Sequence, residues 1–215
     1  MRFIAIIGDI INSRDIQPRQ PFQQKFKRHL DRLNVASAHL ASPYTITLGD
    51  EFQAVYRKAD ALFKDIFSIM VALQPSQARF AIGIGKISTA INRKEAIGMD
   101  GPAFYKARSG IEELREQQRV WGLFAGNHDD KAAEDLRIHH HVFALLSHQM
   151  QSWEPNRFKV LLGLLNHKSQ SDIAKEIGIS AVAVHKNVAA GQLNQTTSYF
   201  EALSDLLNRS LKRDE

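Results

Sequence analysis

Short apolar runs and helically spaced apolar residues divide the first 85 positions into six predicted elements. Residues 3–7 form an unbroken apolar run closed by Gly8 and Asp9, which is typical of a strand buried on both faces. The other predicted strands are residues 44–48, 52–56 and 79–84, and the predicted helices are residues 22–33 and 59–73. This order of elements predicts an α+β fold with a ferredoxin-like sheet and helices on one face.

The pattern changes in the second half of the chain. A further helix and a further strand are predicted before residue 125, but beyond it only helical spacing is found. We therefore predict an α+β domain over residues 1–128, a linker helix over residues 129–152 and an all-α domain over residues 153–215.

The composition is that of an ordinary globular protein. With 44% hydrophobic and 24% charged residues, the chain matches neither a disordered nor a fibrous protein. No apolar run approaches the roughly 20 residues that span a bilayer, and the apolar run at the N-terminus is too short for a signal peptide. We therefore expect a cytoplasmic protein with no membrane partner. The net charge of +5 is compatible with a polyanionic partner.

The chain has no cysteine, so any metal would need carboxylate, histidine or carbonyl ligands. Asp9 and Asp50 are the candidates, because the first strand of a ferredoxin-like sheet lies beside the third. Two neighbouring carboxylates repel unless a cation or a proton neutralises them, and Mg²⁺ is a common solution. We predict that Asp9 and Asp50 share a Mg²⁺ ion. The alternative is that both Gly-Asp pairs are only turns.

The order of these motifs resembles the nucleotidyl cyclase fold of class III cyclases and GGDEF-type diguanylate cyclases. The matching segments are Asp9 after the first strand, Asp50 in the hairpin, Ile82-Gly83-Ile84-Gly85, and Gly101-Pro102-Ala103-Phe104-Tyr105-Lys106-Ala107-Arg108. Over about residues 1–125, the resemblance implies a site for a metal and a nucleotide. The residues that it implies for the nucleotide are Ile10, Asn12, Ser13, Arg14, Gly49, Glu51, Lys106 and Arg108.

Three departures from the cyclase pattern concern the groups that orient the substrate. The position of the ribose-orienting Asn is Tyr105, Arg108 is displaced by one residue, and the purine-selecting Lys corresponds to Ile46. The resemblance therefore implies nucleotide binding more than cyclisation, and no catalytic residue is assigned.

Two longer sequence segments resemble those of a narrower family of proteins. Ile7-Gly8-Asp9-Ile10-Ile11-Asn12-Ser13-Arg14 and Thr45-Ile46-Thr47-Leu48-Gly49-Asp50-Glu51-Phe52-Gln53, in a chain of this length with a helical tail, resemble the SatD family of bacterial proteins. The resemblance runs along the whole chain. It implies relatedness and supplies no established reaction.

Residues 170–188 resemble a helix-turn-helix. Gly178 is expected to end the first helix in a left-handed cap, and Ser180 to cap the second, whose Val184 and Val188 face inward. The exposed side, predicted to contact DNA, comprises Ser180, Ala181, Ala183, His185, Lys186 and Asn187. The alternative is a helical hairpin for protein contacts. A last helix over residues 194–211 is expected to serve as a core or dimer helix.

These observations leave three hypotheses. The leading one is a ligand-responsive DNA-binding regulator, in which a degenerate cyclase-like domain binds a nucleotide with Mg²⁺ and controls a helix-turn-helix that binds double-stranded DNA as a homodimer. The alternative is a metal-dependent cyclase or phosphotransfer enzyme with a regulatory helical tail. The third is a structural adaptor with neither chemistry.

Overall fold

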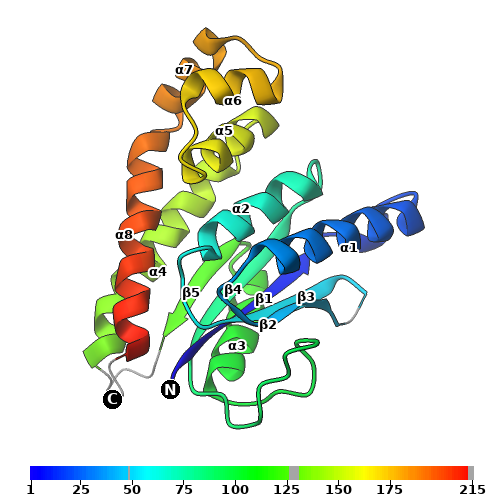
Figure 1. The fold of residues 1–215 in the computed structure, drawn as a ribbon, viewed down its shortest axis with the longest axis vertical. Helices are drawn as coiled ribbons and strands as arrows, with labels where there is room; N and C mark the ends of the chain where they lie inside the picture. Colours follow the sequence, from blue (N-terminus) through cyan, green and yellow to red (C-terminus); the bar gives the residue numbers. More distant parts are fainter. Residues whose placement is uncertain (48, 126–130, 213–215) are drawn as a thin grey trace.

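The computed structural model describes residues 1–47, 49–125 and 131–212, and its centre is a five-stranded mixed sheet in the order β2-β3-β1-β4-β5 (Figure 1). The strands are β1 (Phe3–Ile10), β2 (Leu40–Ile46), β3 (Glu51–Tyr56), β4 (Ala78–Gly85) and β5 (Trp121–Ala125). Neighbours among the first four strands are antiparallel, and β5 is parallel to β4. The predicted α+β class and the predicted adjacency of the first and third strands are confirmed.

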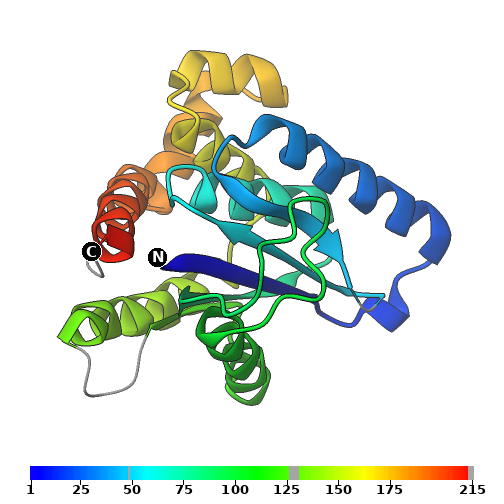
Figure 2. The same cartoon turned by 60° about the horizontal axis from the view of Figure 1, so that its bottom comes forward.

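Helices cover both faces of the sheet (Figure 2). They are α1 (Arg19–Ala36), α2 (Leu62–Leu73), α3 (Pro102–Glu116), α4 (Lys131–Met150), α5 (Pro155–Leu165), α6 (Gln170–Ile177), α7 (Ala181–Ala190) and α8 (Leu193–Lys212), with a short 3₁₀ turn at Ser13–Asp15. The larger core lies between the sheet and α1, α2 and the later helices, and α3 closes a smaller core on the opposite face. Within the described part of the chain, no helix combines the length and the apolar character needed to cross a membrane.

Small residues let α3 lie directly on β4. A Cβ atom added to Gly83 would stand 2.1 Å from the carbonyl oxygen of Ala103, so any larger residue would push the helix away. Ala107 is fully buried one turn later on the same side of α3. The Gly-Ile-Gly phrase of β4 is therefore a packing surface for α3.

β1 and β2 differ from their predicted limits by three residues or more at one end, and the difference in β1 matters for the site. β1 continues through Ile10, so Asp9 lies within the strand and not in a turn after it. β2 begins at Leu40, before Pro43, with shifts of register against β3 on both sides of Ser42. Pro43 is tolerated because β2 is an edge strand, where a missing N–H need not interrupt a ladder.

An aromatic cluster joins the sheet to the helical tail. Phe200 of α8 lies with its ring centroid 5.1 Å from that of Trp121 in β5 and 4.8 Å from that of Phe63 in α2. Phe143 of α4 stacks on Trp121 at 4.7 Å. Because Leu203 and Leu207 are also buried, α8 is a core helix, and its expected role in a dimer stays a prediction.

The predicted domain limits stay a prediction. The boundary at residues 128 and 129 falls on residues 126–130, which lie outside the described residues. On either side of this gap, one hydrophobic cluster contains residues of both the sheet and the tail helices.

We expect Phe200→Ala to lower the free energy of unfolding by about 3–5 kcal/mol, because it removes a fully packed ring from the cluster. Chemical denaturation followed by circular dichroism measures this loss. Val35→Ala is the control, since Val35 is 90% exposed on α1 and should change stability by no more than about 0.5 kcal/mol. A loss below about 1 kcal/mol for Phe200→Ala would show that the tail is not held through this cluster.

Candidate functional site

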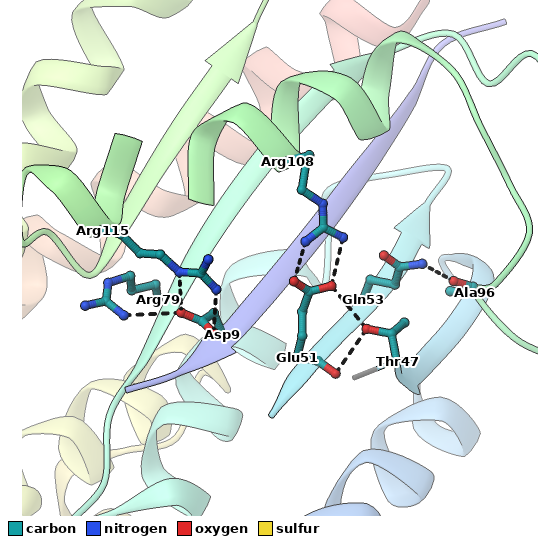
Figure 3. A network of polar contacts seen from close by, with 8 residues as sticks. All are labelled: Asp9, Thr47, Glu51, Gln53, Arg79, Ala96, Arg108 and Arg115. Carbon is teal, nitrogen blue, oxygen red and sulfur yellow. Dashed lines mark hydrogen bonds and ion pairs between the residues drawn. The ribbon is translucent and has the colours of Figure 1, made fainter. Parts of the chain in front are cut away.

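Asp9 lies on the α3 face of the sheet, between two arginines (Figure 3). Side chains alternate along a strand, so the continuation of β1 places Asp9 on the same face as Ala5 and Ile7. Its Oδ2 accepts from Arg79 of β4 at 3.2 Å, and its Oδ1 lies 3.0 Å from a terminal nitrogen of Arg115 in α3. The Nε of Arg115 also donates to Oδ2, so both carboxylate oxygens are engaged.

Glu51 occupies the equivalent place on the neighbouring strand. It is the residue directly opposite Asp9 in the register of β1 and β3, and its side chain is almost fully buried. Both of its oxygens accept from the guanidinium of Arg108 in α3, and Thr47 donates to Oε1 at 3.1 Å. The two neighbouring carboxylates are therefore compensated separately, each by its own arginine of α3.

Arg108 and Arg115 reach the pair because they stand seven residues, about two turns, apart on α3. Hydrogen bonds to Glu51 and Asp9 are the main cause that raises the pKa of each guanidinium above its usual value. About half of each arginine side chain stays exposed, so the outer edges of both guanidiniums face solvent. The result is an ion-pair ladder, made of Asp9, Glu51, Arg79, Arg108 and Arg115. It fixes α3 to β1 and β3, and it links β1 to β4.

Asp50 does not take part in this ladder. It lies in the turn before β3, where its Oδ2 accepts from the hydroxyl of Ser13 at 2.6 Å and its backbone oxygen accepts from the N–H of Ile10. Because both oxygens of Asp9 already bind guanidinium N–H groups, the arrangement does not fit a Mg²⁺ ion held jointly by Asp9 and Asp50. Among the described residues, no group of three or more histidine and carboxylate side chains is placed to hold a metal. The Mg²⁺ hypothesis stays a prediction.

The residues implied for nucleotide binding fall into separate places. Ile10 faces the larger core, and Ser13 binds Asp50, while Arg14 is exposed beside them. Gly49 lies in the hairpin with φ of +62°. On the other face, Glu51 and Arg108 bind each other, and Lys106 donates to the carbonyl of Ile84. Asn12 alone of this set lines an open groove between the loop after β1, the first half of α1 and the loop between α2 and β4.

Arg79 and Arg115 are site residues that the sequence analysis missed. Arg79 stands opposite Asp9 in the register of β1 and β4, and Arg115 repeats the position of Arg108 two turns later. The position of Arg79 in its strand and the seven-residue spacing of Arg108 and Arg115 can be read from the sequence. They point to this site only once Asp9 is placed inside β1. Because the oxygens of both carboxylates already accept from arginine N–H groups, the ladder suits the anchoring of α3 to the sheet.

A second buried polar group lies on the opposite face. The hydroxyl of Tyr56 donates to Asp65 of α2 at 2.6 Å and lies 2.9 Å from the hydroxyl of Tyr44. Burial raises the pKa of Asp65 to about 6, although the hydrogen bond from Tyr56 acts in the opposite direction. Asp65 lines a hollow of about 370 Å³ that also touches the end of α1 and Leu162 of α5.

The pair α6 and α7 has the local geometry expected from its sequence. Gly178 ends α6 with φ of +71°, and the side chain of Ser180 accepts from the N–H of Ala183 at the start of α7. Val184 and Val188 are buried, as predicted. These cap and core predictions are confirmed.

The residues expected to contact DNA are on the outer side of α7, with one qualification. Ser180, Ala181, His185 and Lys186 are exposed, and Ala183 is half-buried. Asn187 is also half-buried, and its amide nitrogen donates to the carbonyl of Ala183 at 2.9 Å. One of its two amide N–H groups is thus used within the helix, and the second N–H and the amide oxygen are left for another partner.

The fold and the sites together define a protein of the α+β class, with a mixed sheet, an internal ion-pair ladder and a helical tail that carries an exposed helix pair. A comparison with known protein families shows the family of the chain. The SatD family matches residues 3–200 of the 215, and the chain belongs to that family. No curated protein matches the sequence.

We expect Asp65→Asn to remove a pH dependence of stability. The carboxyl of Asp65 keeps its proton in the folded protein up to a pH of about 6, whereas the unfolded chain releases it near 3.8. The free energy of unfolding of the wild type should thus fall between about pH 4 and 6, by on the order of 2 to 3 kcal/mol, relative to a variant that cannot ionise.

Urea unfolding of both proteins at pH 4, 6 and 8 measures this difference. Asp205→Asn, at an exposed position of α8, shows what the same chemical change does at the surface. Parallel stability curves for the wild type and Asp65→Asn would contradict the prediction.

Proposed function

We propose that this protein is a DNA-binding regulator in which α6 and α7 act as a helix-turn-helix, α7 enters the major groove, and the α+β part responds to a small ligand. The observation that carries the proposal is the presentation of α7. Its inner side is fixed by two buried valines, and its outer side is exposed at one end of the molecule (Figure 1). A recognition helix needs this combination of a fixed axis and an open face.

Different residues on the exposed side of α7 suit contacts to DNA phosphates and to the edges of the bases. Lys186 and His185 offer donors to phosphates or to purine acceptors, and Ser180 lies at the N-terminal end that approaches the bases. Ala181 suits the methyl group of thymine. Asn187 contributes less than the sequence pattern suggests, because one of its two amide N–H groups is already bonded within the helix.

The surroundings of α7 are only weakly basic. Lys168 binds Glu176, and Arg157 lies with its guanidinium carbon 6.0 Å from the ring centre of Trp153. One copy would therefore make few phosphate contacts. Two copies on two half-sites would raise the affinity without any further basic residue on each.

A surface of α4 supports association with a second copy. Ile138 and Leu145 are 66% and 73% exposed, and they stand seven residues apart on one side of the helix. Exposed apolar side chains in such a row favour pairing with an equivalent row. We include a homodimer through α4 in the proposal.

Helix α5 provides a path from the α+β part to the proposed recognition helix. It packs against α2 on one side and against α6 and α7 on the other. A ligand that shifts α2 or its flanking loops would therefore move the support of α7. The enzymatic alternative has no comparable support, because the two carboxylates of the α3 face are already neutralised by arginines.

We expect Lys186→Ala to weaken binding to duplex DNA of any sequence and to flatten the salt dependence of log K by about one unit, because one phosphate contact is lost. Fluorescence anisotropy of the full chain, titrated from low to moderate salt, measures both quantities. Lys94→Ala is the control, since Lys94 is exposed in the loop before α3. The regulator proposal fails if the wild type binds no duplex DNA at low salt.

We expect Leu145→Glu to convert a dimer to a monomer, because it places a charge in the apolar row of α4. Light scattering coupled to size exclusion gives the mass in solution. Val35→Glu adds the same charge at another exposed apolar position and should leave the mass unchanged. A wild type that is monomeric at high concentration removes α4 from the proposal but leaves DNA binding to its own test.

A further inference from the structure

An open groove lies at the end of the sheet, on the face that carries α1 and α2. It has a volume of about 750 Å³ and runs between the loop after β1, the first half of α1 and the loop between α2 and β4. Its floor is apolar and includes Phe22, Phe26 and Leu73. A volume of this size is within the range of small-molecule sites.

The rim of the groove carries amide side chains that have no partner within the described chain. Asn12, Gln17, Gln74 and Gln77 all line it, and none of their side chains makes a hydrogen bond within the described chain. An amide offers a donor and an acceptor side by side, which is the pattern needed to read the edge of a nitrogen heterocycle. The half-buried ring of Phe22 offers a flat apolar surface to such a ring.

A cationic hollow continues from the groove along α1. Lys25 belongs to both, and the hollow is further lined by Arg28 and Arg32, with one acid, Asp31. Asp31 is already paired with Lys27 at 3.0 Å. The Nε atoms of the two arginines donate to backbone carbonyls of α1, and their terminal nitrogens are left for other partners.

The cationic side chains of this hollow also affect a histidine of α1. The pKa of His29, on the same helix, is lowered first by burial and next by the charge of Arg32, with a further contribution from Lys25. From Lys25 to Arg32 the helix rises by about 10 Å, which is enough for a chain of two or three phosphates.

We infer that this groove and hollow bind a nucleotide, with the base against Phe22 and the amide rim and the phosphates along Lys25, Arg28 and Arg32. The inference rests on the ligand-responsive half of the proposed function and specifies its ligand and its place. The site lies on the opposite face of the sheet from the ion-pair ladder, and it needs neither Asp9 nor Asp50.

The loop between α2 and β4 connects this site to the tail. Gln74 and Gln77 line the groove, and they also line a small crevice against Met150 at the end of α4 and Phe158 of α5. A base that binds the amides of this loop would thus act next to the junction from which α5 carries α6 and α7.

Calorimetric titration of the full chain, without DNA, tests the site. The probes are the di- and triphosphates of adenosine, guanosine, cytidine and uridine, the four nucleosides, and inorganic pyrophosphate. We expect one base to be preferred and the nucleotide to bind more tightly than both its nucleoside and pyrophosphate. Arg28→Gln combined with Arg32→Gln should raise the nucleotide Kd at least about tenfold and leave the nucleoside Kd unchanged.

Two further variants separate the parts of the site. Gln77→Ala should weaken the nucleotide and the nucleoside alike, because it acts on the base. Arg93→Gln combined with Lys94→Gln removes the same charge from an exposed loop outside the site and should leave every Kd unchanged.

Several results would overturn the inference. They are the absence of nucleotide binding, equal affinity for pyrophosphate, an unchanged Kd in the double arginine variant, and a double arginine variant that loses only DNA affinity. The last result would assign α1 to the DNA backbone. Because nucleotide binding is measured without DNA, its failure is distinct from a failure of the wild type to bind duplex DNA.

Discussion

The structure depends on the burial of one aromatic cluster that no single part of the chain could bury alone. Trp121 lies in the last strand of the sheet, where a bare edge would otherwise be exposed, and Phe143 and Phe200 of the tail cover it. Since Phe67 of α2 contacts the same rings, the cluster also fixes the helix that borders the Asp65 hollow. The tail is thereby part of the core that holds the sheet.

The two faces of the sheet carry different kinds of polar chemistry because their partners differ. On the α3 face, small residues bring the helix so close that charged side chains are confined between helix and strands, and each carboxylate requires an arginine. On the other face, α1 and the loop after α2 border an open groove whose rim carries amide side chains. The ion-pair ladder holds α3 rigidly on the sheet, whereas the open groove offers a place for a ligand. The sheet separates the two.

The sequence predicts much of this fold because its signals are local. The apolar run of β1, the helical spacing of α2 and the caps Gly178 and Ser180 each depend on a few neighbouring residues, and each is confirmed. The site depends on one non-local fact, the length of β1. Placing Asp9 after the strand pairs it with Asp50, whereas placing it inside the strand pairs it with Glu51 and two arginines. The groove could not be predicted at all, because its walls come from segments about 60 residues apart in the chain, brought together only by the sheet.

These facts favour different roles for two parts of the molecule, the ion-pair ladder on the α3 face and the loop between α2 and β4. The ion-pair ladder cannot easily rearrange, because separating a buried carboxylate from its arginine leaves a charge without compensation. The loop between α2 and β4 has no such constraint, and it touches both the groove and the start of α5. A ligand-dependent movement should therefore occur in this loop and in the helices that α5 supports, while α3 and the sheet stay fixed. The exposed side of α7, which is carried by α5, is the surface that such a movement would displace the most.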